Sequence, residues 1–166
     1  GDTLAKIAAE KAGIIKRGTA LVLESQEKEA MDVLNKAAER ADIKTTKVVN
    51  LDEIRILPQK DGKQCFSYAG YDAVTMKMLG VHQYENAVAA MLAAELFFEK
   101  YFAGKKSVPE RKALQHAIRE GIDRTQWMGR MELVSNDPFF LMDGAHNSNG
   151  VEALKKSLET MYPDEK

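Results

Sequence analysis

The chain has 166 residues, with 24 lysines and arginines against 25 aspartates and glutamates, and 45% of its residues are hydrophobic. This composition is typical of soluble globular proteins and excludes disordered, collagen-like and coiled-coil chains. A formal net charge of -1 gives no field that would draw the whole chain to nucleic acid or to an anionic membrane. No apolar run approaches the roughly 18–20 residues of a membrane helix. We therefore expect neither nucleic acid nor membrane as a partner.

The chain contains a single cysteine, Cys65. One thiol cannot form an intramolecular disulfide or supply a zinc cluster, which favours a reducing, cytoplasmic setting. The first residues, Gly1 to Thr3, resemble neither a signal peptide nor a translation start. We expect the chain to be a piece of a longer protein.

Apolar residues in the first third of the chain alternate between helical spacing and short continuous runs. The predicted elements are a helix over residues 3–12, a strand over 19–24, a helix over 26–41 and a strand over 44–49. Asp2 or Thr3 could cap the first helix, and Gly13 would end it. The order strand, helix, strand predicts an α/β fold with a parallel sheet and a crossover helix.

The pattern changes after residue 54, where short alternating runs are separated by turn residues. The predicted elements are antiparallel strands within 54–78, a helix over 84–102 that is apolar around most of its circumference, a helix with Pro109 near its first turn that ends at Gly121, strands over 131–134 and 139–142, and a helix over 151–161. The segment 124–127 is the best candidate for a boundary between two domains.

The loop over residues 143–150 joins an apolar strand to a helix, which is where open α/β sheets place their ligands. Asp143 and His146 stand three residues apart in this loop, among glycines and asparagines, and could bind a ribose, a phosphate or a metal ion. The alternative is a helix-capping turn formed by Asn147 to Asn149.

Four further residues are weaker candidates when taken alone. Lys11 follows a glutamate on a helix and would usually be a solvated side chain. His82 would more often be a cap or a packed histidine, whereas Asn86, in the first turn of an apolar helix, must find a hydrogen-bond partner. Arg130 could bind a phosphate bidentately, or could form a surface salt bridge.

Taken in order, these candidates fall within four longer segments. The segments are Gly1-Asp2-Thr3-Leu4 with Ile7-Ala8 and Glu10-Lys11-Ala12-Gly13-Ile14; Leu79-Gly80 with His82-Gln83 and Asn86-Ala87; Trp127 with Gly129-Arg130 and Glu132; and Leu141-Met142-Asp143-Gly144-Ala145-His146-Asn147. Together they resemble the motifs of the folylpolyglutamate synthase and dihydrofolate synthase family, within the Mur ligase superfamily.

The resemblance implies an ATP-dependent ligase that adds L-glutamate to the carboxylate of a folate or pteroate. In that family ATP phosphorylates the carboxylate, the amine of glutamate attacks the acyl phosphate, and Mg2+ bridges the phosphates. The complete enzyme is expected to be a cytoplasmic monomer. The resemblance also implies that residues 1–126 are the later part of a central ATPase domain with a small antiparallel appendage. Residues 127–166 would then begin a Rossmann-like C-terminal glutamate ligase domain.

The resemblance assigns roles to five side chains. Lys11 matches a lysine that carries a carbamate and helps to hold magnesium, so it is expected to be a catalytic residue and a metal ligand. Asn86, Arg130 and Asp143 match contacts to ATP, with Arg130 near the transferred phosphate and Asp143 near the ribose. His146 matches a histidine beside the nucleotide. Arg130 and His146 are accordingly expected to be catalytic as well.

The family's glycine-rich phosphate loop, its first magnesium ligands and much of its folate site lie upstream of the position of Gly1. We therefore expect the isolated chain to be inactive. Two alternatives remain at this point. One is a Mur-superfamily ligase for another acid, including the cell-wall amino-acid ligases. The other is a non-catalytic nucleotide-binding or interaction module that keeps Arg130 and Asp143.

Overall fold

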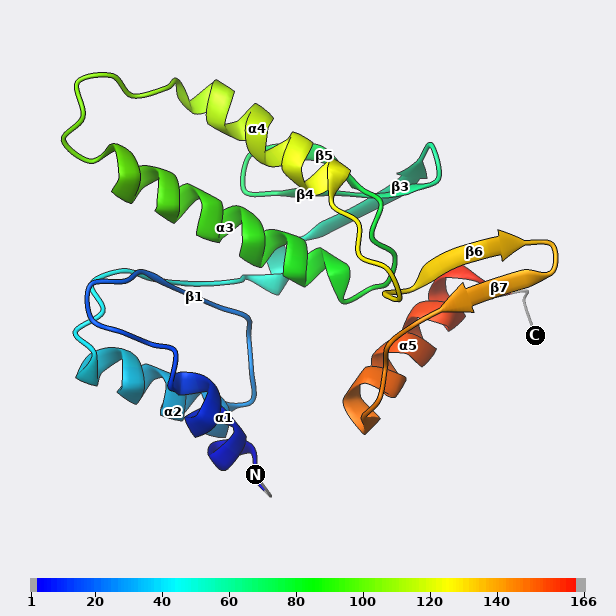
Figure 1. Cartoon of the computed structure of the whole chain (residues 1–166), viewed down its shortest axis with the longest axis horizontal. Helices are drawn as coiled ribbons and strands as arrows, with labels where there is room; N and C mark the ends of the chain where they lie inside the picture. Colours follow the sequence, from blue (N-terminus) through cyan, green and yellow to red (C-terminus); the bar gives the residue numbers. More distant parts are fainter. Residues whose placement is uncertain (1–2, 164–166) are drawn as a thin grey trace. The chain divides into compact units, whose positions relative to one another are not determined.

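The computed structural model describes residues 3–163, in which the chain forms two compact units (Figure 1). Among the described residues, unit 1 comprises residues 3–51 and 88–106, and unit 2 comprises residues 52–87 and 107–163. In the described part of the chain, no helix combines the length and the apolar character needed to cross a membrane. The predicted division into residues 1–126 and 127–166 stays a prediction.

Unit 1 contains a parallel pair of strands with a crossover helix. Its elements are α1 (Leu4–Ala12), β1 (Leu21–Leu23), α2 (Lys28–Arg40), β2 (Thr46–Val48) and the part of α3 (Gln83–Phe102) that begins at Val88. Leu21 pairs with Thr46 and Leu23 with Val48, both in parallel register. Helices α1 and α2 pack against each other (Figure 1). The predicted parallel strand–helix–strand arrangement is confirmed.

Both ends of α1 follow from its capping residues. The Oγ1 atom of Thr3 accepts a hydrogen bond from the backbone N–H of Lys6, at 3.3 Å. The backbone N–H of Gly13 donates to the carbonyl of Glu10 at 3.1 Å and ends the helix. Thr3 is therefore the cap in the described chain, and the other candidate, Asp2, lies outside the described residues together with Gly1.

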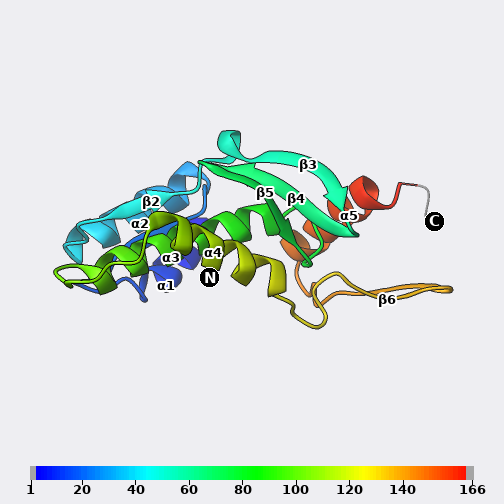
Figure 2. The same cartoon turned by 90° about the horizontal axis from the view of Figure 1, so that it is seen from above.

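Unit 2 contains a three-stranded antiparallel sheet and a separate hairpin. Its elements are β3 (Arg55–Lys60), β4 (Lys63–Tyr68), β5 (Tyr71–Met76), α4 (Arg111–Arg124), β6 (Glu132–Asn136), β7 (Phe139–Met142) and α5 (Ser148–Met161). The 3-10 turn η1 (Leu51–Glu53) precedes β3. Figure 2 shows β4 between β3 and β5, and β6 pairs with β7. These are the predicted antiparallel segments.

The centre of unit 2 is built around the fully buried ring of Phe66 on β4. The Tyr84 ring meets it edge to face, with centroids 5.7 Å apart and an interplanar angle of 76°. Helix α4 packs against β5. Burial of large aromatic rings is the main stabilising contribution of such a core.

Helices α4 and α5 each differ from their predicted bounds by three residues at one end. Helix α4 begins after Pro109, at Arg111, and continues through Gly121 to Arg124. Gly121 does not end the helix because the hydroxyl and the N–H of Thr125 both bond to its carbonyl and carry the helix past it. Helix α5 begins three residues earlier than predicted because Asn147 caps it.

The packing around Gly80, in the loop before α3, can be tested by substitution. Its φ is +112°, and a Cβ there would lie 2.8 Å from His82 Cε1 and 2.9 Å from Met131 Sδ. We expect Gly80→Ala to lower the free energy of unfolding by about 1–3 kcal/mol, measured by denaturant titration. Gly121→Ala is the matched control, because that Cβ would meet nothing within 4 Å and gains helix propensity. Equal unfolding midpoints for wild type and Gly80→Ala would contradict this account.

Candidate functional site

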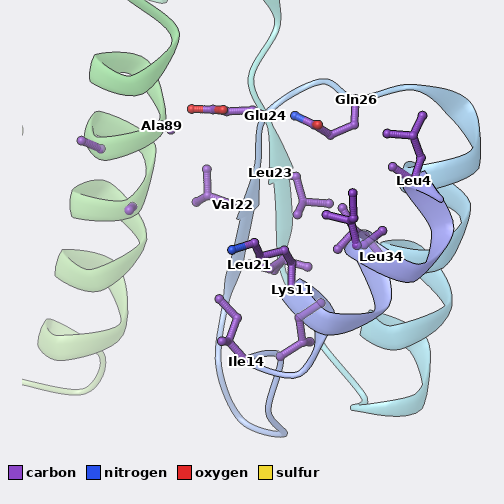
Figure 3. Close-up of a pocket in the computed structure, with 16 residues that line it drawn as sticks. Leu4, Lys11, Ile14, Leu21, Val22, Leu23, Glu24, Gln26, Leu34 and Ala89 are labelled. Carbon is purple, nitrogen blue, oxygen red and sulfur yellow. The ribbon is translucent and has the colours of Figure 1, made fainter. Parts of the chain in front are cut away.

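Lys11 lies beside a largely apolar cavity of about 710 Å³ in unit 1. The cavity is lined by side chains from α1, β1, α2 and α3, and its polar lining includes Glu24 and Gln26. Figure 3 shows the Lys11 side chain extending from the last turn of α1 over β1, with its amine at the cavity. The amine is therefore presented on an apolar surface, with one carboxylate lining the same space.

These residues do not by themselves form a magnesium site. No group of three or more His, Cys, Asp and Glu side chains that could hold a metal ion occurs among residues 3–163. Magnesium prefers oxygen ligands, and the ammonium of Lys11 would repel it. A carbamate on Lys11 would supply one anionic ligand, so the described residues do not fit a complete Mg2+ site. The predicted metal role of Lys11 stays a prediction.

In unit 2, the carboxylate of Asp143 joins two loops. Its Oδ2 accepts the backbone N–H of Met131 and its Oδ1 accepts the N–H of Ala145, each at 2.8 Å. We call these two hydrogen bonds the Asp143 latch. The N–H of Gly144 also donates to the carbonyl of Gly129 at 2.8 Å. The segment before β6 and the loop after β7 are thereby held together.

Arg130 occupies the centre of the segment that the latch holds. Glu132 Oε2 accepts the N–H of Gly129 at 2.8 Å, and the buried Met131 adopts a positive φ of 45°, which a long side chain rarely does. The backbone on both sides of Arg130 is thus fixed. Arg130 is exposed and forms no hydrogen bond or ion pair with residues 3–163, so its fork of N–H donors is available to an anion.

His146 presents its outer nitrogen to solvent. Its Nδ1 lies 2.9 Å from the carbonyl oxygen of Gly144, and because a carbonyl only accepts, Nδ1 carries the hydrogen. The Nε2 atom of the exposed ring then remains an acceptor in the neutral form. The next residue, Asn147, caps α5 by accepting the N–H of Gly150 at 2.9 Å. The alternative of a capping turn is correct for Asn147, and the cap coexists with the latch.

A chain of side-chain contacts leads from Asn86 to His82. Asn86 donates to Gln83 Oε1 at 3.1 Å, which satisfies the predicted need for a partner. The Gln83 amide nitrogen then faces His82 Nε2 at 3.0 Å. Since an amide NH2 only donates, His82 Nε2 accepts and Nδ1 carries the hydrogen. That Nδ1 is buried and has no hydrogen-bond partner among residues 3–163.

The charged side chains near His82 include two of the predicted nucleotide contacts, Arg130 and Asp143. Burial lowers the pKa of the His82 imidazole. The carboxylate of Asp143 acts in the opposite direction, the Arg130 guanidinium lowers the pKa further, and Glu85 raises it. His82 therefore lies within the electrostatic field of both Arg130 and Asp143. The predicted nucleotide contacts Asn86, Arg130 and Asp143 therefore all lie around His82 in unit 2. Lys11 belongs to unit 1.

Sequence reasoning missed two polar residues that hold the loop before α3. The buried amide of Gln64 donates to the carbonyls of Met78 and Gly80, at 2.8 and 3.1 Å. The buried hydroxyl of Ser157 accepts the N–H of Val81 at 3.1 Å. Two features of the sequence could have indicated them: a glutamine beside apolar neighbours in a strand, and a serine on the inner face of a helix. Both side chains would be buried, and buried polar groups need hydrogen-bond partners.

The pKa shift of His82 leads to a pH-dependent stability. In the unfolded chain His82 takes up a proton near its ordinary pKa of about 6.5, whereas the folded chain keeps it neutral to lower pH. The unfolded state therefore binds more protons as the pH falls below about 6.5, and the folded state loses stability. We expect denaturant unfolding to show this loss between pH 7.5 and 5.5, and to show less of it in His82→Gln. The exposed His116 gives the control variant His116→Gln, and an identical pH dependence in both variants would refute the assignment.

Comparison with known proteins bears out the motif resemblance. No protein-family model matches the chain. It is 32% identical to the dihydrofolate synthase/folylpolyglutamate synthase of Bacillus subtilis, over 98% of this chain and 37% of that protein. It is 30% identical to the structure of Mycobacterium tuberculosis folylpolyglutamate synthase complexed with ADP, with a TM-score of 0.74, over 95% of this chain and 35% of that one.

A folylpolyglutamate synthase complex with AMPPCP and folate shares the fold, with a TM-score of 0.83 at 23% identity, over 98% of this chain and 38% of that one. The predicted α/β fold class is confirmed by these matches. Nearly the whole chain is thus related to one segment of the folylpolyglutamate and dihydrofolate synthases, and it spans little more than a third of the length of the bacterial relatives described here.

Proposed function

We propose that the chain is part of an ATP-dependent ligase that joins L-glutamate to the carboxylate of a folate or pteroate. The observation that carries this proposal is the cluster of Asn86, Arg130 and Asp143 around His82, formed by three motifs that are far apart in the sequence. The relatedness to named folylpolyglutamate and dihydrofolate synthases supports the substrate class, and the ADP complex of the M. tuberculosis relative supports the nucleotide.

The chemistry of the reaction explains why such a site needs a fixed cation. A carboxylate is a poor electrophile, so one of its oxygens first takes the terminal phosphoryl group of ATP, with release of ADP. The amine of glutamate then attacks the acyl carbon, and phosphate leaves as the amide forms. Charge on the transferred phosphoryl group requires positioned donors, which we assign to Arg130. Asp143, with two carboxylate lone pairs outside the latch, would accept the ribose hydroxyls.

The remaining assignments concern two side chains, the domains, the oligomeric state and the compartment. We assign Asn86 to a contact with ATP and His146, with its solvent-facing Nε2, to a place beside the nucleotide. Residues 1–126 would belong to the central ATPase domain and 127–166 would begin the C-terminal ligase domain. We also infer a monomeric enzyme of the cytoplasm. The one buried thiol, Cys65, is compatible with that compartment.

The direct test is glutamate incorporation by the full-length protein that contains this chain. Radiolabelled L-glutamate should enter a folate product only when both ATP and the folate are present, with one ADP released per amide. Extension of a different acid, with folates ignored, would favour another ligase of the superfamily. Nucleotide binding without ADP release would favour the non-catalytic module. Either result would overturn the proposed function.

Lys11 should carry a carbamate in the full-length enzyme. An unmodified lysine is an ammonium cation at neutral pH, whereas loss of one proton, addition of CO2 and loss of a second proton convert it into an anionic carbamate. We expect Lys11→Ala to lower turnover, and short carboxylates to restore it in part. A 13C carbamate signal after 13CO2 labelling should be absent from Lys11→Ala and present in Lys16→Ala, an exposed control in the same unit. Unchanged turnover together with an unchanged signal would remove Lys11 from the site.

Substitution of Arg130 and substitution of Asp143 should have different effects on the KM for ATP. Arg130→Ala removes charge stabilisation that is strongest in the transition state, so turnover should fall by about 10² or more. Asp143→Ala removes a ribose contact that is equal in both states, so it should raise the KM for ATP, and because it also breaks the latch around Arg130 it should lower turnover as well. Arg111→Ala, an exposed arginine at the start of α4, is the control. Steady-state kinetics in which the two site variants behave alike would contradict these roles.

A further inference from the structure

Three side chains at the start of α3 form a chain of hydrogen bonds that ends at the protein surface. Asn86 donates to Gln83 Oε1 at 3.1 Å, and the Gln83 amide nitrogen lies 3.0 Å from His82 Nε2. Gln83 is only 7% exposed, so its amide depends on these two partners. Asn86 is exposed, and its Oδ1 accepts no hydrogen bond from residues 3–163. We call His82, Gln83 and Asn86 the amide relay.

The amide relay has a direction, because an amide NH2 group only donates and an amide oxygen only accepts. His82 Nε2 accepts from Gln83, and the Gln83 oxygen accepts from Asn86. The carbonyl oxygen of Asn86 is thereby left to accept from a ligand. The orientation of the Asn86 amide is thus set by the state of His82, two hydrogen bonds away.

Protonation of His82 reverses this direction. A protonated imidazole donates from both nitrogens, so Nε2 can no longer accept from Gln83. The Gln83 amide then turns its oxygen to His82, and its NH2 group donates to the oxygen of Asn86. The ligand then meets the NH2 group of Asn86 in place of the carbonyl oxygen.

The loop that carries His82 is held in place, so the ring does not move away instead. The buried Gln64 donates to the carbonyl of Gly80 at 3.1 Å, and the buried Ser157 accepts the N–H of Val81 at 3.1 Å. A Cβ at Gly80 would lie 2.8 Å from Cε1 of His82, which shows how closely the ring packs on this backbone. A change in the protonation of His82 is therefore accommodated by the two amides.

The groups around His82 favour the direction that the structure shows. Burial lowers the pKa of His82 most strongly, Asp143 raises it, Arg130 lowers it and Glu85 raises it. The net effect is a pKa below the ordinary value of about 6.5. His82 is therefore neutral at neutral pH, and Asn86 offers its oxygen.

We propose that His82 and Gln83 are positioning residues that orient the Asn86 amide, which offers the nucleotide an acceptor while His82 is neutral and a donor once His82 is protonated. This inference rests on the proposed function. The donors of ATP are its ribose hydroxyls and the amino group of its base, and the hydroxyls are assigned to Asp143. Inosine triphosphate (ITP) has a carbonyl oxygen in place of that amino group, so it matches the reversed relay.

Equilibrium binding of ATP and of ITP to the full-length protein tests the relay. We would measure both dissociation constants by calorimetry at about pH 7.5 and compare their ratio, which cancels the attraction of an added charge for the shared phosphates. Wild type should prefer ATP. His82→Lys places a permanent donor beside Gln83, so the preference for ATP should fall about tenfold. His116→Lys makes the same charge change at an exposed position on α4 and should leave the ratio unchanged.

A second substitution should reverse this loss. A carboxylate accepts from both neighbours, so Gln83→Glu combined with His82→Lys should restore the preference for ATP. The preference in wild type should also fall as the pH is lowered through the pKa of His82, and it should stay constant in His82→Gln, which cannot be protonated. This pH series adds no charge to the protein, so it decides the question if His82→Lys does not fold. Unfolding midpoints of all variants establish that the fold is kept.

The inference is overturned if His82→Lys leaves the ratio unchanged, if His116→Lys changes it equally, or if Gln83→Glu does not restore it. It is also overturned if the ratio has the same pH dependence in wild type and in His82→Gln. Glutamate ligation without the expected change in ratio would leave the proposed function standing and overturn the relay. The expected ratios without ligation would support the relay while the proposed function fails, and absence of nucleotide binding would overturn both.

Discussion

The organisation of unit 2 depends on one carboxylate, that of Asp143. It accepts two backbone N–H groups, one from Met131, twelve residues earlier in the chain, and one from Ala145. Charge-assisted hydrogen bonds of this kind are stronger than neutral ones, and removal of the acceptor leaves two donors without partners. The latch therefore fixes the backbone around Arg130, and it places the charge of Asp143 near His82.

Local patterns predicted most of the fold, because they depend on residues that are close in sequence. The apolar run of β1, the amphipathic α2 and the β-branched residues of β2 are sufficient to indicate a parallel pair. The end of α4 was not predictable in the same way, because Gly121 resembles a stop signal until the hydrogen bonds of Thr125 are known. The start of α5 depended on which asparagine of its loop accepts a hydrogen bond.

The candidate site was predicted in part, through the position of its loop at the end of a strand. That position indicated Asp143 and His146, whereas their roles came from resemblance to a family. The state of His82 could not be predicted, because it arises from burial and from charges carried by residues about fifty to sixty positions further along the chain. Nor could the sequence show that Trp127 and Met128 are exposed beside Arg130, because large apolar residues are usually buried.

The central claim is that the Asp143 latch holds Arg130 in place, and amide hydrogen exchange tests it most directly. In wild type, the amides of Met131 and Ala145 should be protected, because both donate to the carboxylate. In Asp143→Asn these two amides should exchange at least about tenfold faster, since a charge-assisted acceptor is lost. Asp137→Asn, in the turn between β6 and β7, should leave their exchange unchanged. Equal exchange of the two amides in wild type and Asp143→Asn would contradict the account.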